Sequence, residues 1–383
     1  MRICLVCTEK LPVPPVSGGA IQTYIAGVLP WLSRVHDVTV VCRTAPGLPD
    51  REAANGVRFV RVPAGAPGGG PAEVYAANVA AFLQGEPPFD RLVVYNRPAF
   101  VPRLAAAAGG AGLILSMHND MFEPDRLAPA VARAVLAQVR AVVTISDHVR
   151  HTINRLHPGF DAKLRTIRSG VDTDQFRPPT PAEKVAVRRQ LGLPSDDPVV
   201  LHVSRFSQRK GNLLLVEAMA DVRQRSPGAR LLVVGSSRYG SDELDPYGQA
   251  VHSRAQTLLG ADGVRFTGFV PPHAVAPFFW AGDLFVCASQ WEEPLARVHY
   301  EAMAAGLPII TTDRGGNAEV MEEGGNGLLV RPHDQPAAFA NAIALLLAGP
   351  ALRERMGRRG RELAVDRYQF RRVAEELLQV LGG

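Results

Sequence analysis

Short apolar runs rich in β-branched residues alternate with longer amphipathic stretches along the first half of the chain. The runs have the length and composition of buried strands, and the stretches between them have a helical period. Strands that alternate with helices are typical of parallel sheets with helices on both faces. The first half therefore predicts a parallel α/β domain. Its expected strands are residues 3–7, 38–41, 57–62, 92–95, 113–116 and 142–145.

The alternation stops at residues 176–181 and then starts again. This segment reads Phe-Arg-Pro-Pro-Thr-Pro, and prolines so close together cannot continue a helix or a strand. We therefore expect an α/β protein of two Rossmann-like domains that face each other across a cleft, with an N-terminal domain at 1–175 and a C-terminal domain at 176–365. The expected strands of the second domain are residues 199–203, 231–234, 264–267, 284–287, 309–311 and 328–330.

The end of the chain has a helical pattern of its own. From residue 366 onwards the apolar side chains recur at the spacing of one helix face. We expect residues 366–383 to form a C-terminal helix that packs back on the N-terminal domain. The apolar positions are Phe370, Val373, Leu377, Leu378 and Leu381.

Composition and charge narrow the class of protein. The 383 residues, of which 46% are apolar, fit a globular protein of two domains. The formal net charge is only +5, which gives no electrostatic footprint for a nucleic acid. The start of the chain lacks the pattern of a signal peptide, and the longest weakly polar run, 104–117, is too short and glycine-rich to span a bilayer. We expect a cytoplasmic protein.

Cys4 and Cys7 have the spacing of a redox or metal-binding pair. They fall in an expected strand, however, where residues three apart point to opposite faces. We expect buried strand cysteines and no metal site here.

Two glutamates in the C-terminal half carry the most specific chemical signal. Glu293 precedes Pro294, and Glu301 follows eight positions after Glu293. Proline is favoured in the first helical turn, so we expect a helix from Pro294, with Glu293 at its mouth and the backbone N–H groups of 295–298 unpaired. At about 1.5 Å per residue, Glu301 lies roughly 11 Å along the axis from Pro294, which exceeds the ~5–9.5 Å between paired glycosidase carboxylates. Two carboxylates that accept hydrogen bonds, separated by a row of N–H donors, fit a nucleotide sugar, which has hydroxyls at both ends and an anion between them. The alternative is two solvated glutamates on a helix.

Basic residues follow the first strand of the C-terminal domain. Arg205 and Lys210 lie in the expected loop between strand 199–203 and a helix that starts at Asn212. Ligands of α/β sheets bind at the carboxyl ends of the strands, so this loop is placed to bind a diphosphate leaving group. A solvated surface loop is the alternative.

Two loops of the N-terminal domain are candidates for ligand contact. Gly18 and Gly19 precede a helical pattern at 21–32, and paired glycines let backbone amides approach an anion closely. His118 follows the strand at 113–116, where it can meet a substrate. A flexible turn and an ordinary loop histidine are the alternatives.

Two acidic motifs give weaker signals. Asp172 and Asp174 have the Asp-x-Asp spacing of metal-dependent transferases, but they directly precede the proline-rich segment, so we expect no metal there. Glu319 is expected in the first turn of a helix after Gly315 and Gly316. A carboxylate favours the helix dipole at that position, whether or not it also contacts a ligand.

Taken in order, these motifs resemble those of the family 4 glycosyltransferases, which have the GT-B fold, and the resemblance covers nearly the whole chain. It rests on Gly18-Gly19, His118, the string Ser169-Gly-Val-Asp172, the loop with Arg205 and Lys210, and Glu293-x7-Glu301. Most members resemble Glu-Pro-Phe-Gly-Leu-Val-Ile-Leu-Glu in the last element. This chain has Leu295, Ala296, Arg297, His299 and Tyr300 instead, and this string, with residues 9–14 and 96–98, is similar to the spore-coat branch of the family.

The resemblance implies a transferase that needs no metal or other cofactor and retains the anomeric configuration of a nucleotide sugar, with a UDP-sugar as the expected donor. It implies that Arg205 and Lys210 bind the diphosphate and that Glu301 binds the ribose. The other implied donor-binding residues are Gly18, Gly19, Gly268, Phe269, Val270, Glu293, Ala296, Arg297 and Val298. The implied acceptor-binding residues are Asn96, Arg97, His118 and Asn119, and the implied catalytic residues are Arg205, Lys210, His118 and Glu293.

The resemblance implies that the acceptor is a hydroxyl group but does not identify the acceptor molecule. A spore-coat or cell-surface glycan is the expected acceptor, and spore-coat proteins are expected partners. The expected location is the cytoplasm or the spore coat. A nucleotide-sugar epimerase that uses His118 and Glu319, a coat component without turnover, and a transferase bound to a membrane through the basic stretch 353–372 are the alternatives.

Overall fold

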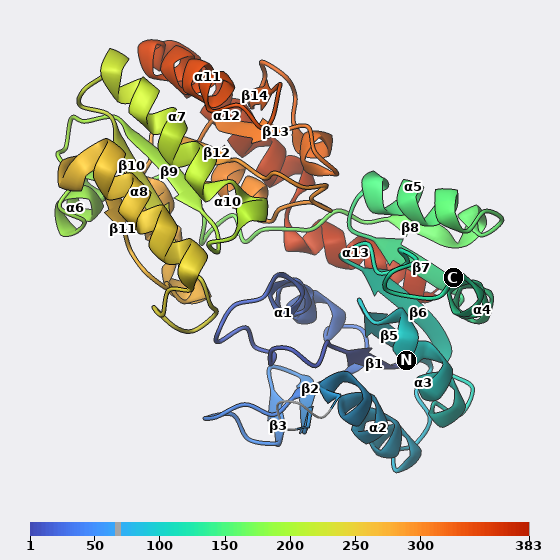
Figure 1. Ribbon diagram of the computed structural model, residues 1–383. Helices are drawn as coiled ribbons and strands as arrows, with labels where there is room; N and C mark the ends of the chain where they lie inside the picture. Colours follow the sequence, from blue (N-terminus) through green and yellow to red (C-terminus); the bar gives the residue numbers. More distant parts are fainter. Residues whose placement is uncertain (66–69, 383) are drawn as a thin grey trace. The chain divides into compact units, whose positions relative to one another are not determined.

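The computed structural model describes residues 1–65 and 70–382, and the chain forms two compact units (Figure 1). Unit 1 comprises residues 1–170 together with the segment that starts at Phe370, and unit 2 comprises Val171–Gln369. The boundaries predicted from the sequence fall after residues 175 and 365, whereas the structural boundaries fall after 170 and 369. The chain thus leaves unit 1 before the proline-rich segment and returns to it only for the last helix.

Unit 1 is built around an eight-stranded sheet in the order β3-β4-β2-β1-β5-β6-β7-β8. All neighbouring strands are parallel except β3 and β4. The strands are β1 (Arg2–Val6), β2 (Asp37–Arg43), β3 (Arg51–Ala54), β4 (Val57–Val62), β5 (Arg91–Tyr95), β6 (Gly112–Met117), β7 (Ala141–Thr144) and β8 (Leu164–Thr166). The α-helices are α1 (Ala20–Leu32), α2 (Pro71–Gln84), α3 (Val101–Ala107), α4 (Pro129–Gln138), α5 (Asp147–Leu156) and α13 (Phe370–Gly382).

The two strands that the sequence analysis did not predict lie at the edges of this sheet. β3 has few apolar residues because it lies at the edge of the sheet, with a neighbouring strand on one side only. It is joined to β4 by Asn55 and Gly56, which both have positive φ. Asn-Gly is the usual sequence of such a two-residue hairpin turn. β8 is three residues long and has a single apolar residue, Leu164. Edge strands of this kind lack the continuous apolar run by which buried strands are recognised.

The C-terminal helix α13 is part of unit 1, where it packs against α1. Val373, Ala374, Leu377 and Leu381 are its buried residues. A Cβ atom at Gly27 of α1 would lie 2.5 Å from the ring of Phe370, so the contact requires glycine there. The helix begins at Phe370 and not at residue 366 as predicted, because α12 continues to Arg367 and the chain turns between the two helices.

Unit 2 contains a six-stranded parallel sheet in the order β11-β10-β9-β12-β13-β14. The strands are β9 (Val199–Val203), β10 (Arg230–Val234), β11 (Val264–Phe266), β12 (Leu284–Cys287), β13 (Ile309–Thr312) and β14 (Gly327–Val330). The α-helices are α6 (Pro181–Gln190), α7 (Asn212–Arg225), α8 (Pro246–Gly263), α9 (Ala276–Ala281), α10 (Val298–Ala304), α11 (Pro336–Ala348) and α12 (Pro350–Arg367).

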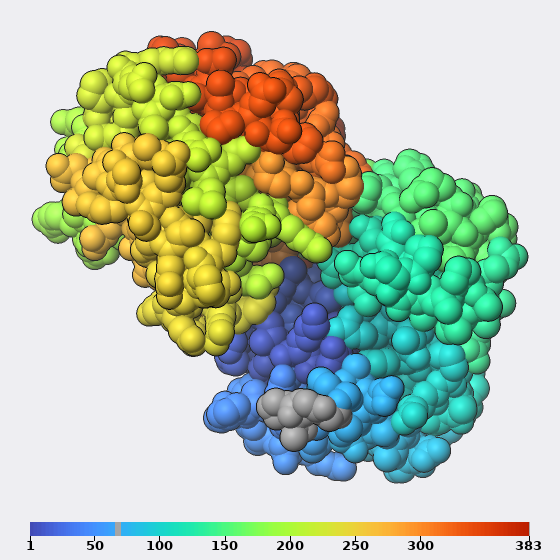
Figure 2. Space-filling model, in the orientation of Figure 1, coloured from blue at the N-terminus to red at the C-terminus, as the bar shows by residue number. Residues whose placement is uncertain are grey.

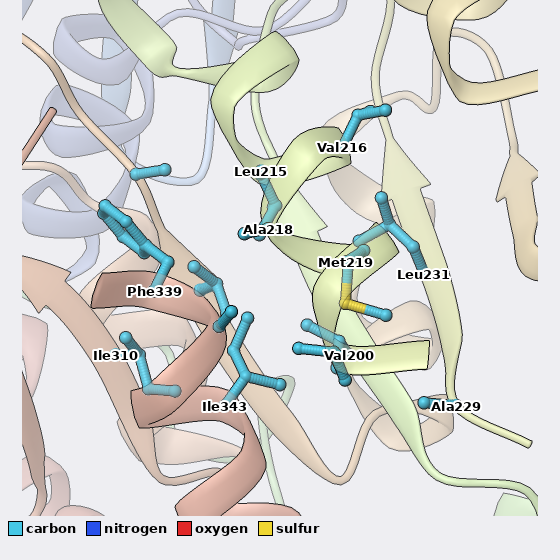
Figure 3. Packing of buried hydrophobic residues seen from close by; sticks show 14 of the residues in the cluster. Val200, Leu215, Val216, Ala218, Met219, Ala229, Leu231, Ile310, Phe339 and Ile343 are labelled. Atoms are coloured by element: carbon cyan, nitrogen blue, oxygen red, sulfur yellow. The ribbon is translucent and has the colours of Figure 1, made fainter. Parts of the chain in front are cut away.

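Successive residues of β12 point to opposite faces of this sheet, and helices cover both faces. Leu284 and Val286 join a buried cluster with residues of α7, α8 and α11. Phe285 contacts Phe279 of α9 and His299 of α10 on the other face. Figure 3 shows side chains of α7 and α11 meeting those of β9, β10 and β13. In the space-filling view, α7 and α8 (yellow-green to yellow) and α11 (orange-red) form the visible surface over the first of these faces (Figure 2).

Cys4, Cys7, Cys42 and Cys287 are buried free cysteines, as predicted for the first two. Burial raises the pKa of each of these thiols, so all four are protonated near neutral pH. Among the helices in the described part of the chain, none is by itself long and apolar enough to cross a membrane. Only α11 and α12 taken together pass that length and composition test, and they are bent by 100° between them.

Replacing Ile343 by Ala is expected to destabilise unit 2 by about 2–5 kcal/mol, because the substitution leaves a cavity between α11 and the sheet. Leu345 on the same helix is 55% exposed, so Leu345→Ala should change the free energy of unfolding by no more than ~0.5 kcal/mol. Urea titrations of both variants followed by circular dichroism measure the difference. Equal losses would contradict this packing of α11.

Candidate functional site

The loops at the carboxyl edge of the unit 2 sheet are packed backbone against backbone. Gly211, Gly235 and Gly315 follow β9, β10 and β13 and have positive φ. A Cβ atom at any of them would lie 2.1 Å from a carbonyl oxygen, that of Ala288, Ser204 or Glu293 respectively. Only glycine allows both the dihedral angle and the approach. These contacts fix the positions of the neighbouring side chains.

The segment that follows β12 does not form the helix predicted from Pro294. α10 begins at Val298, and residues 294–297 are not helical. The loop after β13 holds this segment instead: the N–H of Gly316 donates to the Glu293 carbonyl (2.7 Å), and the N–H of Ala296 donates to Asn317 Oδ1 (3.2 Å). The prediction of a row of unpaired N–H groups at 295–298 is therefore wrong at Ala296. Glu301 lies in the first turn of α10, so the helical estimate of its distance from Pro294 does not apply.

Glu293 forms an ion pair with Lys210, in which the carboxylate is buried and the lysine is partly exposed. Lys210 Nζ lies 2.6 Å from Glu293 Oε2, and the same oxygen accepts hydrogen bonds from Ser289 Oγ (2.9 Å) and Trp291 Nε1 (2.8 Å). Burial opposes ionisation of this carboxyl, but the charge of Lys210 and the three hydrogen bonds outweigh burial and hold the pKa of Glu293 below its ordinary value. The sequence analysis assigned both residues to the donor site, and the structure brings them together.

Glu301 forms an ion pair with Arg297. Arg297 Nη2 donates to Glu301 Oε1 at 2.7 Å, and the two side chains are 15% and 10% exposed. Arg297 Nη1 is buried and makes no hydrogen bond to any described residue. Arg297, at which this chain departs from the common family pattern, thus contacts Glu301, the residue that the resemblance predicts to bind the ribose.

The other polar departure from the pattern, His299, faces the protein interior. Its Nδ1 lies 3.0 Å from the Ala296 carbonyl and its Nε2 lies 2.9 Å from Thr311 Oγ1. Burial lowers the pKa of His299 to about 4, so the imidazole is neutral; Nδ1–H donates to the carbonyl and Nε2 accepts from the hydroxyl. His299 is fully buried and is a packing residue of this edge, whereas Arg297 keeps a partly exposed side chain.

Arg205 and Lys210 follow β9 but contact different groups. The guanidinium of the exposed Arg205 lies over the ring of Tyr239, 4.9 Å from its centroid. Ser204, which stands where the family has glycine, donates to His202 Nε2 (2.8 Å), because His202 Nδ1–H donates to the Val286 carbonyl, and accepts from Asn212 Nδ2 (3.0 Å). Burial lowers the pKa of His202 to about 4, so this imidazole is also neutral.

The predicted base-binding segment lies in the loop after β11. Gly268 has a φ of 73°, and its carbonyl accepts from the N–H of Gly235 (3.1 Å), which ties the loops after β10 and β11 together. The N–H of Phe269 donates to Asp242 Oδ1 (2.5 Å). Phe269 and Val270 are half-buried. This loop is therefore held by Asp242, a residue that the sequence analysis did not single out.

The predicted acceptor-binding residues of unit 1 lie together at the carboxyl edge of its sheet. Asn96 Oδ1 accepts from the backbone N–H groups of His118 (3.1 Å) and Asn119 (3.0 Å). Arg97 Nε and Nη2 donate to the two carboxylate oxygens of Glu9 at 2.7 and 2.5 Å. Burial opposes ionisation of Glu9, but Arg97 outweighs it and lowers the pKa of this carboxyl. The side chains of Asn96 and Arg97 thus organise this edge.

The glycine loop of unit 1 precedes α1, as predicted. Gly18 and Gly19 have φ of 100° and 103°, and Gly19 is the residue directly before the helix. The loop is held by Gln22, whose Nε2 lies 3.2 Å from the Leu11 carbonyl and 3.3 Å from Thr8 Oγ1. The sequence analysis missed Gln22; a buried amide on the first turn of an apolar helix is the signal that could have found it.

The two acidic motifs have local roles. Asp172 Oδ1 accepts from the N–H groups of Asp174 and Gln175, both at 3.0 Å, and so stabilises a turn. Glu319 lies in a short 3-10 helix, Asn317–Val320, where an α-helical first turn was predicted. Within residues 1–65 and 70–382, no group of three or more His, Cys, Asp or Glu side chains is placed to hold a metal ion.

Comparison with known proteins identifies the family. Residues 19–170 match the family model "Glycosyl transferase 4-like domain", and residues 183–363 match "Glycosyl transferases group 1". The chain is 41% identical over 387 residues to "Spore coat protein SA" of Bacillus subtilis strain 168, and the match covers 99% of both chains. This chain belongs to the family 4 glycosyltransferases. A second relative of this glycosyltransferase, 30% identical over 386 residues, is the "GDP-mannose-dependent alpha-(1-6)-phosphatidylinositol monomannoside mannosyltransferase" of Mycolicibacterium smegmatis, with 97% and 96% of the two chains covered.

Solved structures show the same GT-B fold as this glycosyltransferase. Sucrose-phosphate synthase from Thermosynechococcus elongatus has a TM-score of 0.84 at 25% identity, with 99% of this chain and 98% of the other covered. Anabaena Alr3699/HepE in complex with UDP-glucose has a TM-score of 0.80 at 21% identity, with 100% and 99% covered. The prediction of a GT-B architecture with two parallel-sheet domains is confirmed.

Replacing Lys210 by Met in this glycosyltransferase is expected to lower the free energy of unfolding by about 3 kcal/mol at pH 7, because the buried Glu293 carboxylate loses its counter-charge. The pKa of Glu293 is depressed in the folded state, so the stabilisation is present above the unfolded carboxyl pKa of about 4.3 and is lost as the pH falls through the folded value. The difference between variant and wild type should therefore shrink towards pH 3.

Urea denaturation of both proteins between pH 7 and pH 3 measures this difference. The double variant Lys210→Met/Glu293→Gln is the control, because it removes both charges and should recover most of the lost stability. A deficit in Lys210→Met that is the same at every pH would contradict the ion pair as its cause.

Proposed function

We propose that this chain transfers a sugar from a nucleoside-diphosphate donor, with a UDP-sugar as the first candidate, to a hydroxyl acceptor with retention of anomeric configuration. The observation that carries the proposal is the Lys210–Glu293 ion pair at the carboxyl edge of the unit 2 sheet. Nucleotides bind at this edge in open α/β sheets. The pair supplies a cation for a diphosphate and a carboxylate for a sugar hydroxyl within one contact.

Lys210 can bind a phosphate without giving up Glu293. An ammonium group has three N–H donors, and one of them is used by Glu293 Oε2. Arg205, exposed on the same loop, adds a second cation that no described carboxylate neutralises. The two cations together would stabilise the charge that develops on the departing diphosphate, the step at which fixed charges lower a barrier most.

The proposed reaction needs no side-chain base. The bond between the anomeric carbon and the diphosphate oxygen breaks, and the acceptor oxygen forms a bond to the same carbon on the same face. The leaving phosphate oxygen takes the proton of the acceptor hydroxyl. In this scheme Glu293 orients the sugar and Glu301 binds the ribose, and neither forms a covalent bond to the donor.

The nucleobase of the sugar donor has two candidates, guanine and uracil. The GDP-mannose dependence stated for the mycobacterial relative supports a guanine nucleotide, and the UDP-glucose complex of HepE supports a uracil nucleotide. The relative named as a spore coat protein supports a spore-coat or cell-surface glycan as the acceptor and the coat as the place of action.

A nucleotide screen tests the donor site. A ligand present at about 100 times its Kd should stabilise the protein by roughly 2.7 kcal/mol, so differential scanning fluorimetry with UDP, GDP, TDP and ADP should show a rise in Tm for UDP above the others. A larger rise with GDP would replace the uracil donor by a guanine donor. A protein that none of the four nucleotides stabilises would contradict the proposed function.

The role of Lys210 in the reaction is tested against a second lysine that forms an ion pair in the same unit. This lysine is Lys184 of α6, whose Nζ lies 2.7 Å from Asp283 Oδ1. The pair lies away from the loops after β9 and β12. We expect Lys210→Met to lower the kcat for donor hydrolysis or transfer at least 100-fold, and Lys184→Met to leave kcat within about twofold. Transfer rates measured with a radiolabelled donor separate the two, and similar losses would remove Lys210 from the chemistry.

A further inference from the structure

The three hydrogen bonds to Glu293 all end on one of its two carboxylate oxygens. Lys210 Nζ, Ser289 Oγ and Trp291 Nε1 donate to Oε2 at 2.6, 2.9 and 2.8 Å. No hydrogen bond from any described residue ends on Oε1, and Oε1 is not among the fully buried polar atoms that lack a partner. The residue as a whole is only 8% exposed. Oε2 is therefore saturated, and Oε1 is the oxygen that remains accessible to a ligand.

Trp291 links this carboxylate to the loop that carries Lys210. Its indole N–H donates to Glu293, and its ring lies under the guanidinium of Arg209 at 5.0 Å from the centroid. The neighbouring Gln290 N–H donates to the Arg209 carbonyl at 2.8 Å. The segment after β12 and the segment Gln208–Lys210 are thus held together at both the backbone and the side chain of Arg209.

The chemistry of the open oxygen restricts what it can bind. An ionised carboxylate accepts hydrogen bonds and donates none, and the depressed pKa of Glu293 keeps it ionised. A hydroxyl can donate to Oε1. A carboxylate or phosphate of a ligand at the same place would be repelled, because two like charges in a poorly solvated site raise each other's energy.

We propose that Trp291, together with Ser289, is a positioning residue that fixes Glu293 so that Oε1 accepts a hydrogen bond from a hydroxyl of the donor sugar and thereby selects a neutral sugar at that position. This inference rests on the proposed function of unit 2 as the nucleotide-sugar site. It assigns to Trp291 a role in recognising the sugar and none in recognising the nucleotide.

The chain offers a matched control for Trp291. Trp280 of α9 also donates its indole N–H, to the Arg177 carbonyl at 2.9 Å, and its ring also lies near an arginine, Arg177, at 4.9 Å from the centroid. Both tryptophans belong to unit 2. Phenylalanine keeps an aromatic ring in each case and removes the N–H donor, and both variants lose the same part of the indole ring. The two variants therefore lose the same kind of hydrogen bond, but only one of them loses it at Glu293.

The experiment compares the binding of UDP-glucose and UDP, or of GDP-mannose and GDP if the nucleotide screen selects guanine, by wild type, Trp291→Phe and Trp280→Phe. Loss of a hydrogen bond to a charged group should weaken the nucleotide sugar about tenfold in Trp291→Phe, while the Kd of the free nucleoside diphosphate changes less than twofold. Trp280→Phe should leave both affinities unchanged. Isothermal titration calorimetry gives both constants for each protein.

The ratio of the two affinities decides the outcome. A Trp291→Phe variant that binds the nucleotide sugar as wild type does, or that loses both affinities equally, overturns the inference while the proposed function stands. A wild type that binds neither the nucleotide sugar nor the free nucleoside diphosphate overturns the proposed function and the inference with it. Ser289→Ala removes a different donor from Oε2 and should shift the ratio in the same direction, which keeps the test decisive if Trp291→Phe fails to fold.

Discussion

The buried carboxylate of Glu293 is the constraint on which the carboxyl edge of the unit 2 sheet depends. A charge that is removed from water must be paired and hydrogen-bonded, or it is neutralised by protonation. Lys210, Ser289 and Trp291 meet this requirement from two different loops. The loop after β9 can approach Ala288 only because Gly211 has no Cβ atom, and the loop after β13 can approach Glu293 only because Gly315 has none. The close backbone packing of these loops is therefore what allows the charge of Glu293 to be stabilised.

A second ion pair next along the chain has a different character. Arg297 and Glu301 contact each other across one helical turn, so their geometry follows from the start of α10 and not from packing between distant loops. Each of the two glutamates has a cation on one oxygen. This leaves the edge with two acceptors of fixed direction and only a small net charge from the two pairs. Such a surface suits a ligand with separate hydroxyl groups better than a small anion.

The sequence was sufficient to predict most of the fold because buried parallel strands are continuous apolar runs, and β9 and β12 have the predicted bounds. Residue type and position also singled out Lys210 and Glu293, which the structure places 2.6 Å apart, while their role in binding a donor stays a prediction. The sequence could not place α10 correctly, because Pro294 is a favourable first helical residue only where nothing else holds the chain, and here Asn317 and Gly316 hold it from the loop after the neighbouring strand β13. The hydrogen-bond partners of Trp291 and Gln22 could likewise not be predicted from the sequence, since neither contact follows from local spacing.

The return of the chain to unit 1 at Phe370 has a consequence for how the protein is made. Because α13 follows all of unit 2 in the sequence, unit 1 lacks this helix until all of unit 2 has been synthesised. Until then the face of α1 around Gly27 lacks the cover that Phe370 gives it in the finished protein. Unit 2 is contiguous and can fold as it emerges. Unit 1 is thus completed only after unit 2 has been synthesised.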